Sequence, residues 1–579
     1  MKLVAAAAVL SSIAPVVATA DKEYTFDEIP AAEDLSWYPC NLAFTCARLS
    51  VPLNPLKPNN GLRSEIPLVL YPADPSDEYK GAVLVNPGGP GISGTDFILQ
   101  AAPVIANLTG PGWDIIGFDT RGTGYSKPNG AVGYHGVPLV PEVQNATNIL
   151  SDNVTKGSIR KFKRRSELKI PYKSDAWLQK QYEDGEELNT LIQKYANKEN
   201  QAVPYMTTPH VAFDMLQIAK AHARSEDLPD KDVLVNYYGS SYGTLLGQTF
   251  ASLYPQHVGK FVLEGVVDMK AYYGGSLGPN HLDKTISNFV TTCSDAGPKG
   301  CAFATGKGRD DVLKRFNDLM AHFDSAKAVA ENWANATIVE EAHDVVRGIF
   351  TSVGYDAQEA FPILADQLVL LEGWVKSNTV AENREKLLSW IASPFSFLTR
   401  KEYYYEILCS DMAGNEFVGS KKLSKEFVDS VRSGSTVAGD TLALTYAICS
   451  SLDLKPNWKF NGTVGGETKT PMLFVGVSGD PVTPAENAEG AQKLYKNSEM
   501  VHVEGDAHSI IYLQNKCAND NVKVYFQNLT LPGNNNRCAR DTAPIFPKSN
   551  SAGLSPLKSL DGFGRTMALT ILLFIGLMF

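Results

Sequence analysis

The sequence predicts an α/β fold, with a mostly parallel central sheet flanked by helices and a large helical cap inserted into it. From Gly81 onward, short apolar runs alternate with Gly-rich turns and helical stretches. This alternation is typical of a parallel sheet, whose strands are joined by crossover helices. Between about residues 270 and 455 the apolar residues instead recur with a period of 3.6, and few runs favour strands. We expect this segment to be the cap.

The expected strands are short apolar runs that end in turns. They are residues 82–85, 113–118, 233–238, 261–263, 472–477 and 500–503. Residues 242–253 form an expected helix after the third strand, and residues 311–323 and 360–375 have helical periodicity within the cap. Residues 131–200 are polar, and we expect this segment, with its basic run at 161–165, to be a solvated excursion rather than a binding patch.

The composition allows a large folded core and argues against one class of partner. The chain has 579 residues, of which 44% are hydrophobic. Its 63 acidic residues outnumber its 53 basic ones, which gives a formal net charge of -10. Because a net negative charge repels a polyanion, nucleic acid is not an expected partner.

The N-terminus has the layout of a cleaved secretory signal. Residues 1–20 contain a basic Lys2, an apolar run and small residues at the expected cleavage site before Asp21. A membrane anchor is the alternative, but two serines and Pro15 interrupt a run already shorter than the roughly 20 apolar residues of a transmembrane helix. We therefore expect the mature protein to enter the secretory pathway.

The C-terminus resembles a signal for a glycosylphosphatidylinositol (GPI) anchor. Small residues around Asn550 and Ser551, the expected attachment site, precede a polar spacer and an almost wholly apolar tail at 566–579. A transmembrane helix is the alternative, but this tail is short for a hydrocarbon core roughly 30 Å thick. We expect an extracellular, cell-surface protein attached to the membrane only through a lipid anchor.

These signals define the predicted organisation of the chain. It comprises a signal peptide (1–20), a first part of the sheet domain (21–269), the helical cap (270–455), a C-terminal part of the sheet domain (456–541), a linker (542–552) and a GPI-attachment propeptide (553–579). One domain with a large insertion fits the length as well as several separate domains do.

Eight cysteines and six glycosylation sequons agree with an extracellular protein. The cysteines are Cys40, Cys46, Cys293, Cys301, Cys409, Cys449, Cys517 and Cys538. We expect them to form disulfides; eight cysteines allow 105 pairings, but the close spacing of the first two pairs favours sequential bridging. The Asn-x-Ser/Thr sequons are at Asn107, Asn145, Asn153, Asn335, Asn461 and Asn528.

Ser241 is the predicted nucleophile. Residues 239–243 spell Gly-Ser-Ser-Tyr-Gly directly after an apolar strand and directly before a helix. In a nucleophile elbow the serine sits in a strained turn, where side chains two residues away would collide. Ser240 is adjacent, but only Ser241 has glycine at both flanking positions.

Asp480 and His508 are the predicted partners of this serine. A serine needs a general base and the base needs an orienting acid, which follow in the order Ser, Asp/Glu, His in this type of site. Each residue follows an expected strand by a short turn, so both should lie at the carboxyl edge of the sheet. His502 competes as the base but lies within a strand, and Glu486 is the reserve acid.

The oxyanion formed by such a reaction needs two backbone N–H donors. We expect one from Tyr242, directly after the nucleophile, and one from the Gly- and Pro-rich loop at 86–91. Glycines let that backbone approach the reacting carbonyl, and prolines stiffen it. Gly89 is the chosen donor.

The same loop offers a rival interpretation as a dinucleotide site. Gly89, Gly91 and Gly94 match GxGxxG after a strand, as in a flavin or nicotinamide enzyme. Asp114 or Asp119 would then bind the ribose. This interpretation fits less well, because it leaves the serine turn unexplained and places a proline where N–H groups should face phosphate.

Several motifs occur together between about residues 37 and 541. They are 86–94 (NPGGPGISG), 119–126 (DTRGTGYS), 237–244 (YYGSSYGT), 263–268 (LEGVVD), Cys409-Ser-Asp411, 479–484 (GDPVTP), His508, Cys517 and the stretch from 531 to Cys538. Together they resemble the tripeptidyl aminopeptidase family of α/β-hydrolases, relatives of prolyl aminopeptidase. The resemblance implies the α/β-hydrolase fold and exopeptidase activity, with Ser241, Asp480 and His508 as nucleophile, orienting acid and base.

The resemblance also implies that carboxylates near the cap hold the free amine of the substrate. The candidates are Glu264, Asp268, Glu406 and Asp411. Each has a structural alternative, because acids at strand ends and beside cysteines also cap helices or pair with a base such as Arg121. Glu264 stands where many relatives carry Asp, and residues 131–200 contain no motif that aligns.

The sequence thus predicts a secreted serine hydrolase that cleaves short peptides from the free N-terminus and needs no metal or cofactor. No HExxH motif occurs among its nine histidines. Carboxylesterases and lipases share this triad and fold, so ester hydrolysis is the alternative. A catalytically silent fold that acts as a cell-surface binding module is a third class, which the complete triad disfavours.

Overall fold

A computed structural model describes residues 22–130, 166–196, 201–277, 280–323, 336–390, 402–415, 417–541 and 544–546. The central feature of this part of the chain is a sheet of ten strands. The strands are β1 (Tyr38–Asn41), β2 (Phe44–Pro52), β3 (Arg63–Tyr71), β4 (Gly81–Asn86), β5 (Trp113–Phe118), β6 (Val235–Ser240), β7 (Val258–Glu264), β8 (Leu473–Val477), β9 (Glu499–Val503) and β10 (Arg537–Cys538). Their spatial order is β1-β2-β3-β5-β4-β6-β7-β8-β9-β10.

The sheet is mostly parallel, as the sequence predicts. Every pair from β5 through β10 is parallel. Only β1, β2 and β3, which precede the first predicted strand, and the contact of β3 with β5 are antiparallel. The carboxyl ends of β6, β8 and β9 therefore lie at one edge of the sheet, and the predicted catalytic residues follow these ends.

Helices cover both faces of the sheet. They are α1 (Gly94–Thr109), α3 (Thr208–Ser225), α4 (Tyr242–Leu253), α5 (Met269–Tyr273), α15 (Ala485–Gln492), α16 (Ile510–Leu513) and α17 (Lys516–Asn528), with short 3-10 turns η2 (Val203–Tyr205), η3 (Pro255–His257) and η5 (Gly533–Asn535). One core joins α3, α4 and α15 to the sheet, and another joins α1 and α17. Consecutive residues Tyr237 and Tyr238 of β6 point into these two different cores, as strand geometry requires.

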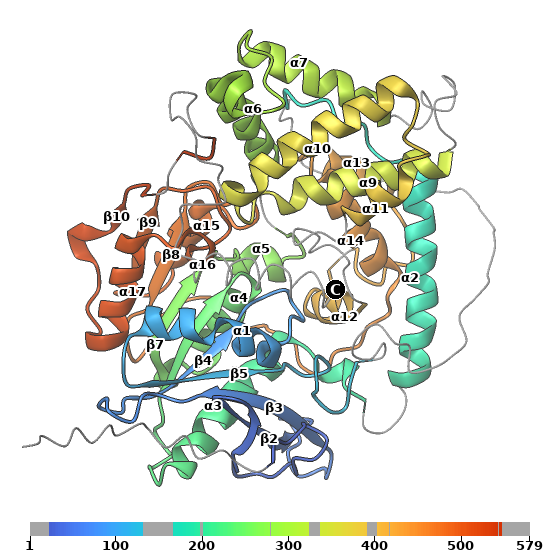
Figure 1. Cartoon of the computed structure of the whole chain (residues 1–579). Helices are drawn as coiled ribbons and strands as arrows, with labels where there is room; N and C mark the ends of the chain where they lie inside the picture. Colours follow the sequence, from blue (N-terminus) through green and yellow to red (C-terminus); the bar gives the residue numbers. More distant parts are fainter. Residues whose placement is uncertain are drawn as a thin grey trace, which may run out of the picture.

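The segment between α5 and β8 consists of helices. They are α6 (Leu282–Gly300), α7 (Arg309–Met320), η4 (Ala321–Phe323), α9 (Ala336–Ser352), α10 (Ala357–Ser377), α11 (Arg384–Ser389), α12 (Glu402–Asp411), α13 (Lys425–Ser433) and α14 (Gly439–Ser451). Of these, α6, α7, α9, α10 and α11 share a core of their own, whereas α12 and α14 share a core with α4 and α5. Phe289, Phe316, Phe350 and Phe361 are fully buried in the core of this cap. Figure 1 shows α6, α7, α9 and α10 as a layer on one side of the sheet domain. Among the described residues, no helix is both long and apolar enough to cross a bilayer.

The expectation of a solvated excursion at 131–200 is wrong for the part that the structure describes. Residues 175–196 form helix α2 (Asp175–Ala196), which packs along α14. Leu178 and Tyr182 are one helical turn apart, and both are buried against α13 and α14. Leu168 and Ile170 enter the cap core. The basic run at 161–165 lies outside the described residues.

The eight cysteines pair in chain order. The disulfides are Cys40–Cys46, Cys293–Cys301, Cys409–Cys449 and Cys517–Cys538. The third joins α12 to α14 within the cap, and the fourth joins α17 to β10 at the edge of the sheet. Each bridge therefore restrains one domain internally, and none of them ties the cap to the sheet.

A buried ion pair fixes the loop that follows β5. The Arg121 guanidinium donates to both carboxylate oxygens of Asp214 on α3, at 2.7 and 2.8 Å. It also donates to the carbonyls of Pro52 and Leu53 at the end of β2. Arg121 and Asp214 are 0% and 1% exposed. Arg121 is thus committed to Asp214 and does not serve as the partner of a substrate-binding carboxylate.

Replacing Asp214 with alanine should strongly destabilise the protein. The substitution leaves the Arg121 charge buried without a counterion, which costs about 3–5 kcal/mol. The measurement is the midpoint of urea unfolding. As a matched control, Asp184→Ala removes the exposed partner of Lys180 on α2, and it should change stability by about 0.5 kcal/mol or less. Equal shifts in the two variants would contradict the buried-pair argument.

Candidate active site

Ser241 occupies a strained turn between β6 and α4. Its φ of 56° and ψ of -124° lie in a region that residues other than glycine rarely adopt. A Cβ at Gly239 would lie 2.6 Å from the Gly243 carbonyl oxygen, and one at Gly243 would lie 2.4 Å from the Asn86 carbonyl oxygen. The turn therefore requires both glycines for the packing reason that the sequence motif implies. Ser240 is buried, whereas Ser241 is partly exposed.

Asp480 and His508 form a buried, hydrogen-bonded pair. His508 Nδ1 lies 3.0 Å from each carboxylate oxygen of Asp480. Asp480 is 0% exposed and His508 is 2% exposed. The backbone N–H groups of Val482 and Thr483 donate to Asp480 Oδ1 at 2.9 and 2.8 Å. These donors fix the direction of the carboxylate, and the carboxylate in turn orients the imidazole.

The serine turn and the histidine loop meet at the end of β7. The Ser241 N–H donates to the Glu264 carbonyl at 3.1 Å. A Cβ on the next residue, Gly265, would lie 3.4 Å from His508 Cε1 and 2.9 Å from the His508 carbonyl oxygen. His508 Nε2 is buried and has no hydrogen-bond partner within the described part of the chain. With Nδ1 bound to Asp480, Nε2 is the atom left to act on a hydroxyl.

The Gly-rich loop after β4 packs directly on the serine turn. A Cβ at Gly88 would lie 2.8 Å from Ser241 Cβ and 3.1 Å from the Tyr242 nitrogen. The Gly88 N–H already donates to Asn86 Oδ1 at 3.0 Å. Tyr242 is the first residue of α4, so its N–H has no acceptor within the helix. The N–H groups of Gly89 and Tyr242 are therefore the donors that we assign to an oxyanion.

The dinucleotide interpretation of this loop does not fit the structure. Asp119 is buried, and its carboxylate accepts hydrogen bonds from Ser93, Thr95 and Tyr125. Asp114 lies near the amino end of β5, where it accepts bonds from the Ala73 N–H and the Tyr79 hydroxyl. Ribose binds at the carboxyl edge of such a sheet. Asp119 lies there, but its carboxylate is buried and already bonded, and Asp114 lies at the opposite end of β5.

Thr483 is a functional candidate that sequence reasoning missed. Its hydroxyl donates to Asp480 Oδ2 at 2.8 Å and lies 3.2 Å from His508 Nδ1. The side chain is buried. The available signal was its place three residues after Asp480, where a threonine can bond back to an aspartate. The reserve residues are not near this pair: Glu486 is exposed on α15, and His502 lies on β9, 3.7 Å from Glu489.

The four candidate amine-binding carboxylates each have contacts within the protein. Glu264 accepts the Ile510 N–H at 2.7 Å, and Asp268 caps α5 by accepting the Ala271 N–H at 3.0 Å. Glu406 is buried on α12, with its carboxylate against Gly130. Hydrogen bonds within the protein thus give at least two of these acids, Glu264 and Asp268, a structural role.

Asp411 belongs to a buried hydrogen-bond network that reaches Tyr242, whose N–H is one of the two assigned oxyanion donors. It accepts the Thr208 N–H and hydroxyl at 2.8 and 2.6 Å and the Tyr272 hydroxyl at 3.2 Å. The Thr208 hydroxyl also lies 2.6 Å from the Tyr242 hydroxyl. Burial raises the pKa values of both Asp411 and Glu264 to about 7, so neither is fully ionised at neutral pH. A bound ammonium group would favour the ionised form of either carboxyl.

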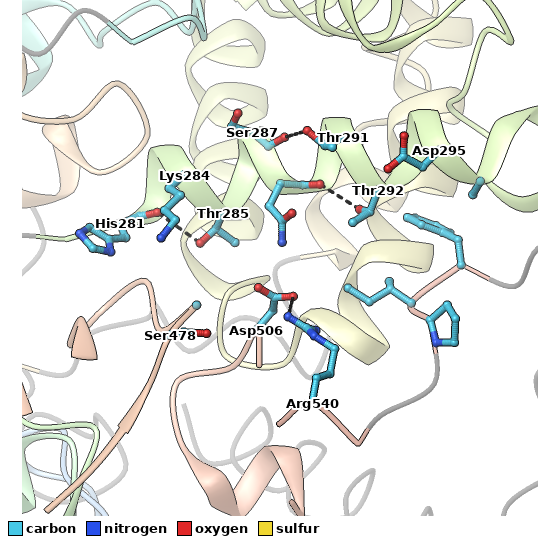
Figure 2. Close-up of a pocket in the computed structure, with 16 residues that line it drawn as sticks. His281, Lys284, Thr285, Ser287, Thr291, Thr292, Asp295, Ser478, Asp506 and Arg540 are labelled. Carbon is cyan, nitrogen blue, oxygen red and sulfur yellow. Dashed lines mark hydrogen bonds and ion pairs between the residues drawn. The ribbon is translucent and has the colours of Figure 1, made fainter. Parts of the chain in front are cut away.

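A pocket of about 640 Å³ lies beside the catalytic pair, between α6 and the loops after β8 and β9. Figure 2 shows Lys284, Thr292 and Asp295 of α6 facing Ser478 and the ion pair of Asp506 with Arg540. Ser478 and Asp506 each lie two residues before a member of the predicted triad. The triad side chains themselves do not line this pocket. Among the described residues, no cluster of His, Cys, Asp or Glu is suited to hold a metal ion.

Comparison with known proteins identifies the fold and similar enzymes. Residues 81–281 match the family model described as alpha/beta hydrolase fold, and residues 435–538 match that described as TAP-like protein. The tripeptidyl aminopeptidase of Streptomyces lividans is 24% identical over 86% of this chain and 84% of its own length. Over most of its length the chain is thus similar to tripeptidyl aminopeptidases, and its sheet domain matches the α/β-hydrolase fold. It is a serine hydrolase of the peptidase type.

Two further relatives of this chain carry different names. The serine protease Hip1 of Mycobacterium tuberculosis is 24% identical over 41% of each chain. Carboxylesterase B of the same organism is 40% identical, but over only 14% of this chain and 16% of its own length. The long similarity is thus to a peptidase, and the short one is to an esterase.

Removing the Thr483 hydroxyl should slow turnover without unfolding the protein. Thr483→Val takes a hydrogen bond from a charged carboxylate, which corresponds to about 1.5–3 kcal/mol, or roughly ten- to hundredfold in kcat/KM. Thr483→Ser keeps the hydroxyl and should retain most activity. The measurement is steady-state hydrolysis, with circular dichroism as the folding control. An unchanged rate in the valine variant would show that the Thr483 hydroxyl is not needed to orient Asp480 and His508.

Proposed function

We propose that this serine peptidase cleaves short peptides from a free N-terminus through an acyl-enzyme on Ser241. The observation that carries the proposal is the state of His508: Asp480 holds its Nδ1, while its Nε2 is buried and without a partner in the described part of the chain. An imidazole held at Nδ1 in this way presents Nε2 as the atom that can accept the proton of a serine hydroxyl.

Acylation follows from these contacts. His508 Nε2 accepts the Ser241 hydroxyl proton as Oγ bonds to the carbonyl carbon of the scissile peptide. The carbonyl oxygen becomes an oxyanion, to which the N–H groups of Gly89 and Tyr242 donate. Asp480 stabilises the imidazolium that forms. When the C–N bond breaks, His508 returns the proton to the leaving amine, and the acyl group remains on Ser241.

Deacylation repeats the sequence with water. His508 Nε2 accepts a proton from a water molecule as its oxygen attacks the acyl carbon. The same two N–H groups bind the second oxyanion. As the ester bond breaks, His508 returns the proton to Ser241 Oγ, which releases a peptide acid and restores the enzyme.

The substrate class rests on the relatives and on the cap. The longest similarity reported above is to a protein named for tripeptide release from the amino end. The cap is a layer of helices beside the catalytic edge of the sheet (Figure 1), and such a cover would exclude folded proteins by size. Ester hydrolysis is the second candidate, because carboxylesterase B matches a short part of the chain.

We also propose that the protein is secreted, glycosylated and held at the cell surface by a GPI anchor. Asn107, Asn461 and Asn528 are exposed, as glycosylation requires. The four cystines are of the kind that persists in an oxidising compartment. Asn145, Asn153, Asn335, the predicted signal peptide and the attachment site at Asn550 and Ser551 lie outside the described residues.

Substrate choice is tested with three substrates and one variant. The secreted protein should cleave a tripeptide amide with a free amine and cleave its N-acetylated form at least about tenfold less well, because acetylation removes the charge that is bound. Ser241→Ala should lower both rates by at least about 10³-fold. The third substrate is a short-chain ester. Turnover of the ester alone would support the esterase alternative, and activity that survives in the variant would exclude Ser241 as nucleophile.

The anchor is tested by enzymatic release. Intact cells that produce the full chain should carry the peptidase activity on their surface, and a phosphatidylinositol-specific phospholipase C should move most of it into the medium, because it cuts the lipid from the protein. A chain without residues 553–579 should be found in the medium without treatment. Surface activity that resists the phospholipase, but is lost on this truncation, would indicate a transmembrane tail instead.

A further inference from the structure

The turn between α9 and α10 lies against both loops that carry the catalytic pair. This cap turn comprises residues 353–357. Its contacts are made to the sheet domain directly beside Asp480 and His508. They connect the position of the cap to the position of the triad.

The first contact is to the loop of the orienting acid. A Cβ at Gly354 would lie only 2.2 Å from Pro481 Cγ, so the turn backbone packs directly on the residue after Asp480. A second cap segment reaches the same residue, because the His281 N–H donates to the Pro481 carbonyl at 2.7 Å. The cap therefore holds the acid loop at two points.

The second contact is to the loop of the base. Asp356 pairs with Ala507 in an antiparallel bridge, and the Ala357 N–H donates to the Asp506 carbonyl at 3.2 Å. The His508 N–H donates to the Tyr355 carbonyl at 3.2 Å. The Tyr355 ring meets the imidazole edge to face, with centroids 4.9 Å apart and planes at 74°. Both the main chain and the ring of His508 thus touch one cap residue.

These contacts add to those that the sheet domain supplies. Asp480 and Thr483 contact His508 at Nδ1, and Gly265 lies close to its Cε1 and carbonyl oxygen. Tyr355 adds a ring contact from the cap and the acceptor for the His508 main-chain N–H. Because proton transfer tolerates misplacement of only a fraction of an ångström, a catalytic base needs more than one support.

We propose that Tyr355 is a positioning residue for His508, through which the cap holds the general base in its reactive place. The inference rests on the proposed Ser241–His508 mechanism. It predicts that the cap is needed for the chemistry itself and not only for selecting substrates. The opposing view is that Tyr355, which is only partly buried, is a wall of the substrate site.

A small covalent probe separates the two views. A fluorophosphonate needs His508 to activate Ser241, but it has no peptide to place under the cap. Tyr355→Ala should lower the second-order rate of phosphonylation, and kcat for peptide and ester, by a common factor of about ten to a hundred, with little change in KM. Tyr355→Phe keeps the aromatic ring that contacts His508 and should stay within about twofold of the native rates.

A second variant tests the turn without altering a side chain that could face substrate. Ala357→Pro removes the N–H that bonds to Asp506, at the first position of α10, which tolerates proline. It should slow phosphonylation as well, and thermal unfolding checks that both variants are folded. If the folded Tyr355→Ala variant is phosphonylated at the same second-order rate as the unaltered protein, and only its KM for peptide is raised, the proposal is overturned. If native protein is not phosphonylated at all, the proposed mechanism fails rather than this inference.

Discussion

The Glu264 carbonyl accepts the Ser241 N–H, and the Glu264 carboxylate accepts the Ile510 N–H two residues beyond His508. One residue at the end of β7 thus connects the serine turn to the histidine loop. The next residue, Gly265, has φ +60° and lies so close to His508 and Thr483 that a side chain would crowd both. The end of β7 holds the proposed site together, because β7 lies between β6, which precedes Ser241, and β8, which precedes Asp480.

This junction has an electrostatic consequence. Burial raises the pKa of Glu264 to about 7 and, in the network behind Tyr242, that of Asp411 to about 7. A carboxyl whose folded pKa lies above its unfolded value of about 4 favours the folded state in its neutral form. That contribution is complete below the unfolded pKa and is lost as the pH rises through about 7. The contribution of Glu264 and Asp411 to stability therefore falls between about pH 4 and pH 7.

The sequence predicts what depends on neighbouring residues and on strand ends. Ser241 could be found because its two glycines and the strand before it are local, and Asp480 and His508 because each follows a strand whose end must lie at the same edge. The packing of α2 on α14 and the Tyr355 contact could not be predicted, since they join segments hundreds of residues apart or on separate domains. The duties of Asp411 depend likewise on Thr208 and Tyr272, which no local pattern places beside it.

Chain order explains why the cap contact matters. The proposed nucleophile precedes the cap, whereas the proposed acid and base follow it, so the insertion separates Ser241 from Asp480 and His508 along the chain. Among the described residues, none of the four disulfides joins the cap to the sheet domain. Their relative position then depends on non-covalent contacts such as those of the cap turn with Pro481 and His508.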